Sequence, residues 1–237
     1  MGNMKEWRRG VQDGLPICFG YFAVSFAFGI QARSVGMTAF QAVLMSVTNL
    51  TSAGQFASLD TIAASATYFE MAFLQLVINM RYFLMSCSLS QKISYGMHPI
   101  HRFFMAYGVT DEIFGVSVCR PGALSPWYFY GLMSVAVPGW GLGTLVGVIC
   151  GNVLPVSIIN ALGIAIYGMF LAVILPAAKK DKVVAGVVIC AMILGCVMRC
   201  TPVLCRISSG MQIIIIILIV AGAAAWLFPR EEAEHAG

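Results

Sequence analysis

The sequence has little charge. Only 10% of its 237 residues are Asp, Glu, Lys or Arg, whereas 59% are hydrophobic and the mean hydropathy is +0.87. Soluble domains carry about 25% charged residues, and a globule of this size keeps much of its surface in water. The composition therefore excludes a soluble globular protein, a disordered chain and a nucleic-acid-binding protein. Lipid is the solvent that suits it.

The sequence also lacks the usual signatures of enzymes and metal sites. It contains no GxSxG or HExxH motif and no tight CxxC pair, and its histidines lie outside the apolar segments. We therefore predict no enzymatic activity, no cofactor and no bound metal. Because the loops are short, we predict one transmembrane domain over residues 1–237.

Apolar segments recur at lengths that suit membrane helices, which need roughly 20 apolar residues. We predict an all-α polytopic membrane protein with about eight transmembrane helices, one of them broken. The predicted crossings are 15–33, 37–67, 71–90, 103–118, 126–151, 153–178, 183–199 and 211–228. The positions of Lys and Arg favour cytoplasmic termini under the positive-inside rule, and a re-entrant 37–67 segment is the alternative to a crossing.

Two patterns concern the packing of these helices. Leu15-Pro16 and Leu154-Pro155 open apolar runs that would cross in opposite directions, which suggests an inverted repeat of the kind found in secondary transporters. Small residues at every fourth position let two helix backbones approach closely, within the chain or between the subunits of an oligomer. Such a run is formed by Gly139, Gly143, Gly147 and Gly151.

A polar stretch interrupts the second predicted crossing. Residues 46–61 carry Ser, Thr, Asn, Gln and Asp around Gly54, which does not suit a lipid-facing helix. A broken helix explains them, because such side chains satisfy the backbone groups that a break frees. The N-terminus of the second half-helix would attract an anion such as a carboxylate, whereas a wet loop is the alternative. The substrate-binding residues predicted here are Asn49, Ser52, Gly54 and Gln55.

Arg81 lies near the middle of segment 71–90, where an arginine costs about 2.5–3.5 kcal/mol on insertion scales. Asn79 and other polar residues project from the opposite face, so protein should surround this helix. Arg81 is then either a hydrogen-bond hub between helices or a guanidinium that binds a substrate carboxylate. We predict that Asn79 and Arg81 bind substrate.

Two adjacent carboxyl groups, Asp111 and Glu112, lie in segment 103–118. A carboxyl group that leaves water holds its proton more tightly and can exchange it near neutral pH, as proton-relay carboxyls do. The pair could instead bind a substrate ammonium group, pair with Arg81, or lie at a helix end in water. We predict that Asp111 and Glu112 couple transport to protons.

Together these stretches resemble the AzlC family, the large subunit of bacterial branched-chain amino acid exporters. The resemblance covers about the first half of the chain. It rests on Asp13-Gly14-Leu15-Pro16, Ala27-Phe28-Gly29, Ser52-Ala53-Gly54-Gln55-Phe56, Asn79-Met80-Arg81 and Thr110-Asp111-Glu112. One departure is Ser52-Ala53-Gly54, where the family pattern would read closer to Gly-Ala-Ser. The resemblance implies an inner-membrane exporter of valine, leucine and isoleucine that is coupled to an ion gradient and assisted by a small AzlD-like membrane subunit.

We therefore predict a secondary transporter that exports branched-chain amino acids across the cytoplasmic membrane by alternating access. A transporter of another small zwitterion is one alternative. A membrane assembly or scaffold subunit without transport activity is another, and the glycine run would suit it. A channel is disfavoured, because the polar residues cluster at a few depths and do not line a continuous pore.

Overall fold

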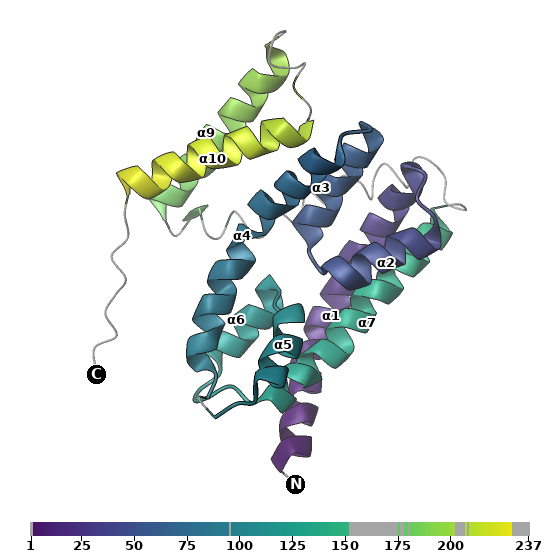
Figure 1. The fold of residues 1–237 in the computed structure, drawn as a ribbon, viewed down its shortest axis with the longest axis vertical. Helices are drawn as coiled ribbons and strands as arrows, with labels where there is room; N and C mark the ends of the chain where they lie inside the picture. Colours follow the sequence, from purple (N-terminus) through teal and green to yellow (C-terminus); the bar gives the residue numbers. More distant parts are fainter. Residues whose placement is uncertain are drawn as a thin grey trace. The chain divides into compact units, whose positions relative to one another are not determined.

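The fold is helical. The computed structural model describes residues 2–94, 96–151, 175, 178–179, 181–201, 207 and 209–228. Its helices (Figure 1) are α1 (Gly2–Ser34), α2 (Ala39–Asn49), α3 (Ser52–Ala63), α4 (Tyr68–Lys92), α5 (Pro99–Tyr107), α6 (Asp111–Cys119), α7 (Pro126–Cys150), α9 (Lys182–Cys200) and α10 (Ser209–Leu227). Within the described ranges the only β-type pairing is an isolated bridge between Ile93 and Leu124. The all-α prediction is therefore confirmed.

Four helices are long and apolar enough to cross a membrane: α1, α4, α7 and α9. They match the predicted crossings 15–33, 71–90, 126–151 and 183–199. The predicted count of about eight crossings is not confirmed. The apolar part of α10 is shorter, and nearly all of 153–178 lies outside the described residues.

The described chain divides into two compact units. The larger holds residues 2–59 and 78–151, and the smaller holds residues 60–77 and the described residues from 175 onward. Helices α3 and α4 each have residues in both units. The predicted functional residues all belong to the larger unit.

Helices α1 and α7 lie side by side and run in the same direction (Figure 1). Gly10 of α1 faces Tyr128 near the start of α7, and Gly29 faces Thr144 near its end. A Cβ atom at Gly147 would overlap the carbonyl oxygen of Phe26. The glycine run is therefore a backbone-to-backbone contact, as predicted, and its partner helix belongs to the same chain.

Helices α2 and α3 form a hairpin that enters and leaves the bundle at one end, which corrects the prediction that 37–67 is one crossing. Ala42 of α2 and Leu59 of α3 pack in one cluster with Phe28 near the end of α1. Between the two helices Leu50 adopts a left-handed conformation (φ 47°), which reverses the chain. Leu50 packs in a different cluster, with Tyr21 at mid-height of α1. The polar break is therefore the tip of a hairpin.

Helices α5 and α6 form a second hairpin, so the predicted single crossing helix at 103–118 is not confirmed. The Lys92 ammonium, just before the hairpin, donates to the carbonyl oxygens of Val118 and Arg120, just after it. Arg120 in turn binds Glu6 Oε2 at 2.5 Å, near the start of α1. Thr110 at the tip is the N-cap of α6 and accepts from the Ile113 N–H. A threonine followed by two acidic residues is a helix-start signal, and here it starts the returning helix.

The two hairpins enter from opposite ends, each after a long helix. The hairpin α2–α3 follows the end of α1, whereas α5–α6 follows the end of α4 at the level where α1 begins. This inverted arrangement differs from the predicted repeat, whose second member, Leu154-Pro155, lies outside the described residues.

Positive charge is unevenly distributed between the two ends of the larger unit. The cations at the end where α1 begins are Lys5, Arg8, Arg9, Lys92, Arg102 and Arg120, whereas Arg33 lies at the other end.

Candidate functional site

The tips of the two hairpins meet inside the larger unit. The Tyr107 hydroxyl at the end of α5 donates to the Val47 carbonyl oxygen near the end of α2, with an O···O distance of 2.5 Å. Residues of α4 reach both tips, because Asn79 accepts a hydrogen bond from Thr51 and Arg81 pairs with Asp111. We call the two tips, residues 49–52 and 108–112, together with the α4 residues 79–82, the tip site.

An ion pair joins α4 to the second tip. Arg81 Nη1 lies 2.8 Å from Asp111 Oδ2, and the two side chains are 41% and 44% exposed. The other terminal nitrogen of Arg81 contacts the Tyr82 hydroxyl oxygen at 3.3 Å. Its Nε is buried and makes no hydrogen bond in the described structure. The guanidinium therefore has an unused donor, and the pair is open enough for a ligand to reach.

Glu112 has a different partner from Asp111. Its Oε2 accepts from the hydroxyl of Tyr21, which comes from the middle of α1, at 2.6 Å. The same hydroxyl lies 2.6 Å from Thr110 Oγ1. Tyr21 is buried, whereas the Glu112 side chain is exposed. The two adjacent carboxylates thus face different helices, which their position in the sequence does not reveal.

Neutral hydrogen bonds hold the first tip. The Thr51 hydroxyl donates to Asn79 Oδ1 at 2.9 Å and accepts from the backbone N–H of Gly54 at 3.4 Å. Thr51 thereby satisfies one of the N–H groups at the start of α3 and ties that helix to α4. Asn79 therefore contacts the break between α2 and α3 through Thr51. Gly54 is buried in the first turn of α3. The break is polar inside, as predicted for residues that satisfy freed backbone groups.

Gln55 lies in a separate buried network. It is fully buried, its Nε2 donates to Ser46 Oγ at 2.9 Å, and its Oε1 accepts from Trp140 Nε1 at 3.0 Å. Ser46 also shares a 2.7 Å hydrogen bond with Thr144 of α7. Trp140 can only donate, so the orientation of the Gln55 amide is fixed. The network anchors α2 and α3 to α7, and it uses both the nitrogen and the oxygen of the buried Gln55 amide.

The remaining predicted residues flank the first tip. Asn49 is the exposed last residue of α2, and Ser52 is the half-buried first residue of α3. Two histidines among the described residues, His98 and His101, serve local structure. His98 caps α5 through its Nδ1, and His101 Nδ1 lies 2.8 Å from the Tyr130 hydroxyl near the start of α7.

Tyr21 and Trp140 were missed at the sequence level. Their rings meet edge to face with centroids 5.2 Å apart, between the acidic tip and the Gln55 network. Each lies well inside an apolar helix, where its polar atom must find a partner. That need is the signal that could have identified them, although it does not tell which residue the partner is.

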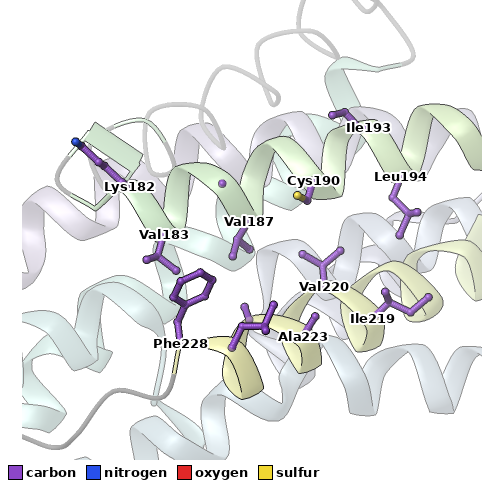
Figure 2. A pocket seen from close by; sticks show the side chains of 13 residues that line it. Lys182, Val183, Val187, Cys190, Ile193, Leu194, Ile219, Val220, Ala223 and Phe228 are labelled. Carbon is purple, nitrogen blue, oxygen red and sulfur yellow. The ribbon is translucent and has the colours of Figure 1, made fainter.

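A groove between α9 and α10 is apolar. It has a volume of about 690 Å³ and is lined by aliphatic side chains, Phe228, Cys190 and, at one end, Lys182 (Figure 2). The labelled side chains in Figure 2 include no acid and no amide that could orient a zwitterion. This groove therefore lacks groups that would orient both charges of a zwitterion, whereas the tip site contains an exposed cation and an exposed carboxylate.

Comparison with known proteins identifies the family of this chain. The family model described as AzlC protein matches residues 16–154, which include both hairpins and α7. The chain belongs to the AzlC family. An uncharacterized membrane protein of Archaeoglobus fulgidus is 31% identical over 183 residues, covering 76% of this chain and 80% of the relative. The inner membrane protein YgaZ of Escherichia coli K12 is 25% identical over 181 residues, covering 73% and 74%. No solved structure matches the chain.

This AzlC protein is therefore a membrane protein, as its composition predicted. The match, residues 16–154, covers most of the larger unit and also residues 60–77 of the smaller one. A role in membrane transport follows from the family. The resemblance seen in the five short motifs is confirmed over a longer stretch than those motifs span.

Proposed function

We propose that this protein exports branched-chain amino acids and is driven by a proton gradient. The observation that carries the proposal is the half-exposed Arg81–Asp111 ion pair between two hairpin tips. An amino acid carries the same two charges in a small space, so it can replace each residue as the partner of the other. An ion pair that served only stability would cost free energy inside a membrane protein, because both ions lose hydration.

In this mechanism the substrate carboxylate binds the exposed part of the Arg81 guanidinium and the start of α3. A helix N-terminus attracts an anion through its free N–H groups. The substrate ammonium group binds Asp111. Apolar side chains around the tips would accept the branched side chain. The polar tips then lie near mid-membrane, where irregular backbone is tolerated if protein or a water-filled cavity surrounds it.

The charge distribution supports a cytoplasmic N-terminus. Within the larger unit the cations concentrate at the end where α1 begins, and Lys and Arg mark the cytoplasmic side of membrane proteins. Under this orientation the α5–α6 hairpin enters from the cytoplasm and α2–α3 from outside. The two hairpins would then start from opposite sides of the membrane and meet at their tips, between the two solutions to which alternating access must open the site. We propose the cytoplasmic membrane as the location, with the C-terminus also cytoplasmic.

A small AzlD-like membrane subunit is part of the proposal and rests on the family resemblance. No enzymatic step, cofactor or metal is involved. A scaffold subunit without transport activity is the rival function. It leaves the half-exposed charges at the tip site without a role, whereas a transporter uses both.

The test is transport in proteoliposomes. The full-length protein is reconstituted with and without its small partner, a pH gradient is imposed, and movement of labelled leucine is followed. We expect leucine movement that needs the gradient. The Arg81→Ala variant should lose it while remaining in the membrane as folded protein.

A matched control is Arg9→Ala, which removes an exposed arginine from α1. It should transport like the wild type. Wild-type rates in Arg81→Ala would refute the proposed site. A folded, stoichiometric complex that moves neither leucine nor another small zwitterion would favour the scaffold function.

A further inference from the structure

The two carboxylates of the tip site have different surroundings. Asp111 faces the permanent positive charge of Arg81 from α4. Glu112 faces the neutral hydroxyl of Tyr21 from α1. The other ionisable group near this hydroxyl is Tyr82 of α4, and Asp111 is the charged neighbour along α6. A proton added to Asp111 would break an ion pair, whereas a proton added to Glu112 would meet a group that can either donate or accept.

The hydrogen-bond geometry around Tyr21 has two complete arrangements. Tyr21 has one hydroxyl hydrogen but two oxygen neighbours at 2.6 Å, Glu112 Oε2 and Thr110 Oγ1. When Glu112 is ionised, Tyr21 donates to Glu112 and Thr110 donates to Tyr21. When Glu112 is protonated, its own O–H donates to Tyr21, and Tyr21 donates to Thr110. One proton is gained, the Tyr21 hydroxyl donates one hydrogen bond in both arrangements, and Thr110 continues to accept from the Ile113 N–H.

We propose that Glu112 alone carries the coupling proton and that Asp111 binds the ammonium group of the substrate. Tyr21 is the positioning residue, and its hydroxyl changes its hydrogen-bond partner when Glu112 gains or loses a proton. This inference rests on the proposed transport function and divides it between two adjacent residues. The proton comes from water on one side of the membrane, binds the Glu112 carboxylate, and leaves to water on the other side.

Tyr21 is well placed to pass the change on. Its ring is buried and meets the ring of Trp140 at an interplanar angle of 76°. Trp140 donates to Gln55, which binds the α2–α3 hairpin together. A reversal of the Tyr21 hydroxyl at one tip is therefore connected through one aromatic contact to the anchor of the other hairpin.

The experiment compares two kinds of transport in the same proteoliposomes, with the small partner included if wild-type transport needs it. Leucine–leucine counterflow without a pH gradient reports substrate passage. Gradient-driven leucine accumulation reports proton coupling. We expect E112Q to keep counterflow within about twofold of wild type and to lose accumulation. We expect D111N to lose both, because Arg81 keeps its charge without a partner and the substrate ammonium loses its ligand.

The conservative variant Y21F tests the positioning role. It keeps the ring and its contact with Trp140 but removes the hydroxyl that donates to ionised Glu112. The pH profile of driven transport should change, because the hydroxyl that donates to ionised Glu112 is gone. A purely structural tyrosine would change the amount of folded protein and leave the profile unmoved.

Matched controls are E70Q, which neutralises a carboxylate in the smaller unit, and Y130F, which removes a hydroxyl bonded to His101. Both should behave as wild type. Driven accumulation by E112Q would overturn the inference, and so would loss of its counterflow, because Glu112 would then serve the substrate. If E112Q does not fold, an unshifted pH profile in Y21F overturns it. A wild-type protein that moves no leucine in either assay instead refutes the proposed function.

Discussion

The α2–α3 and α5–α6 hairpins have similar shapes and different chemistry. Each follows a long helix, enters the larger unit and turns at a polar tip. The first tip is held by uncharged groups, with Thr51 and Gln55 both buried and bonded. The second carries Asp111 and Glu112, which are exposed and have an ionic and a phenolic partner.

The difference shows which hairpin a small ion can act upon. Neutral buried hydrogen bonds do not respond to a proton or to an amino acid, because breaking one leaves an unsatisfied group in a dry interior. An accessible carboxylate changes its partners when it is neutralised or when another cation arrives. We infer that the second hairpin responds directly to substrate and proton, and that the change reaches the first hairpin through Tyr21 and Trp140.

The largest loss of folded protein should come from disrupting the α1–α7 contact, which is the scaffold that both hairpins share. Gly147→Leu places a side chain where the α1 backbone at Phe26 already lies, so α1 and α7 must separate. We expect little or no folded protein after membrane extraction, as measured by size-exclusion chromatography.

The control for this scaffold variant is Gly20→Leu, at a glycine of α1 with open space around its Cβ position. It should give normal amounts of folded protein. Equal yields from both variants would show that the α1–α7 contact does not support the hairpins.

The second-largest effect should be a loss of stability without a loss of transport, which would distinguish the α2–α3 hairpin from the α5–α6 hairpin. Gln55→Ala leaves a cavity and removes the partners of Trp140 and Ser46, which should lower the free energy of unfolding by about 2–4 kcal/mol. Thermal unfolding in detergent measures the loss, and the exposed Gln12→Ala is the control. Leucine transport per folded molecule should stay near wild type. Normal stability with lost transport would instead make Gln55 a ligand for the substrate.

Arg81→Lys, next to the α5–α6 hairpin, should lower transport without lowering stability, which is the opposite of Gln55→Ala. Lysine keeps the charge but loses the planar fork and the Nε donor, so it cannot hold Asp111 and a carboxylate in the same geometry. We expect leucine transport to fall at least about tenfold, equivalent to 1.4 kcal/mol, with unchanged thermal stability. The exposed Arg9→Lys serves as control. Transport at wild-type rate would mean that only the charge of Arg81 matters.

The smallest effect should come from Trp140→Phe. The ring still packs on Tyr21, but the hydrogen bond to Gln55 Oε1 is lost, at a cost of about 0.5–1.5 kcal/mol. Thermal unfolding of the single variants and the double variant gives a double-mutant cycle. In a Gln55→Ala background the same substitution should cost less. Additive losses would show that the two residues do not act together.

Sequence patterns revealed the chemistry of this site better than its topology. The cost of an arginine in an apolar helix was enough to predict a partner for Arg81, and the glycine run was enough to predict close helix packing. Both hairpins were read as crossings because apolar length does not reveal direction. The decisive contacts, Ala42 with Leu59 and Lys92 with the carbonyl oxygen of Arg120, join residues that lie apart in the sequence. The same holds for Tyr21, whose partners Thr110 and Glu112 are far along the chain.

The most direct test of the account is the effect of leucine on thermal unfolding of the purified protein. A ligand that binds the folded state stabilises it, by about 2.7 kcal/mol at a concentration 100 times its Kd. Leucine should raise the melting temperature of the wild type and of Gln55→Ala, and should leave Arg81→Ala unchanged. An equal rise in Arg81→Ala would contradict the central claim that the substrate binds at the charged hairpin tip.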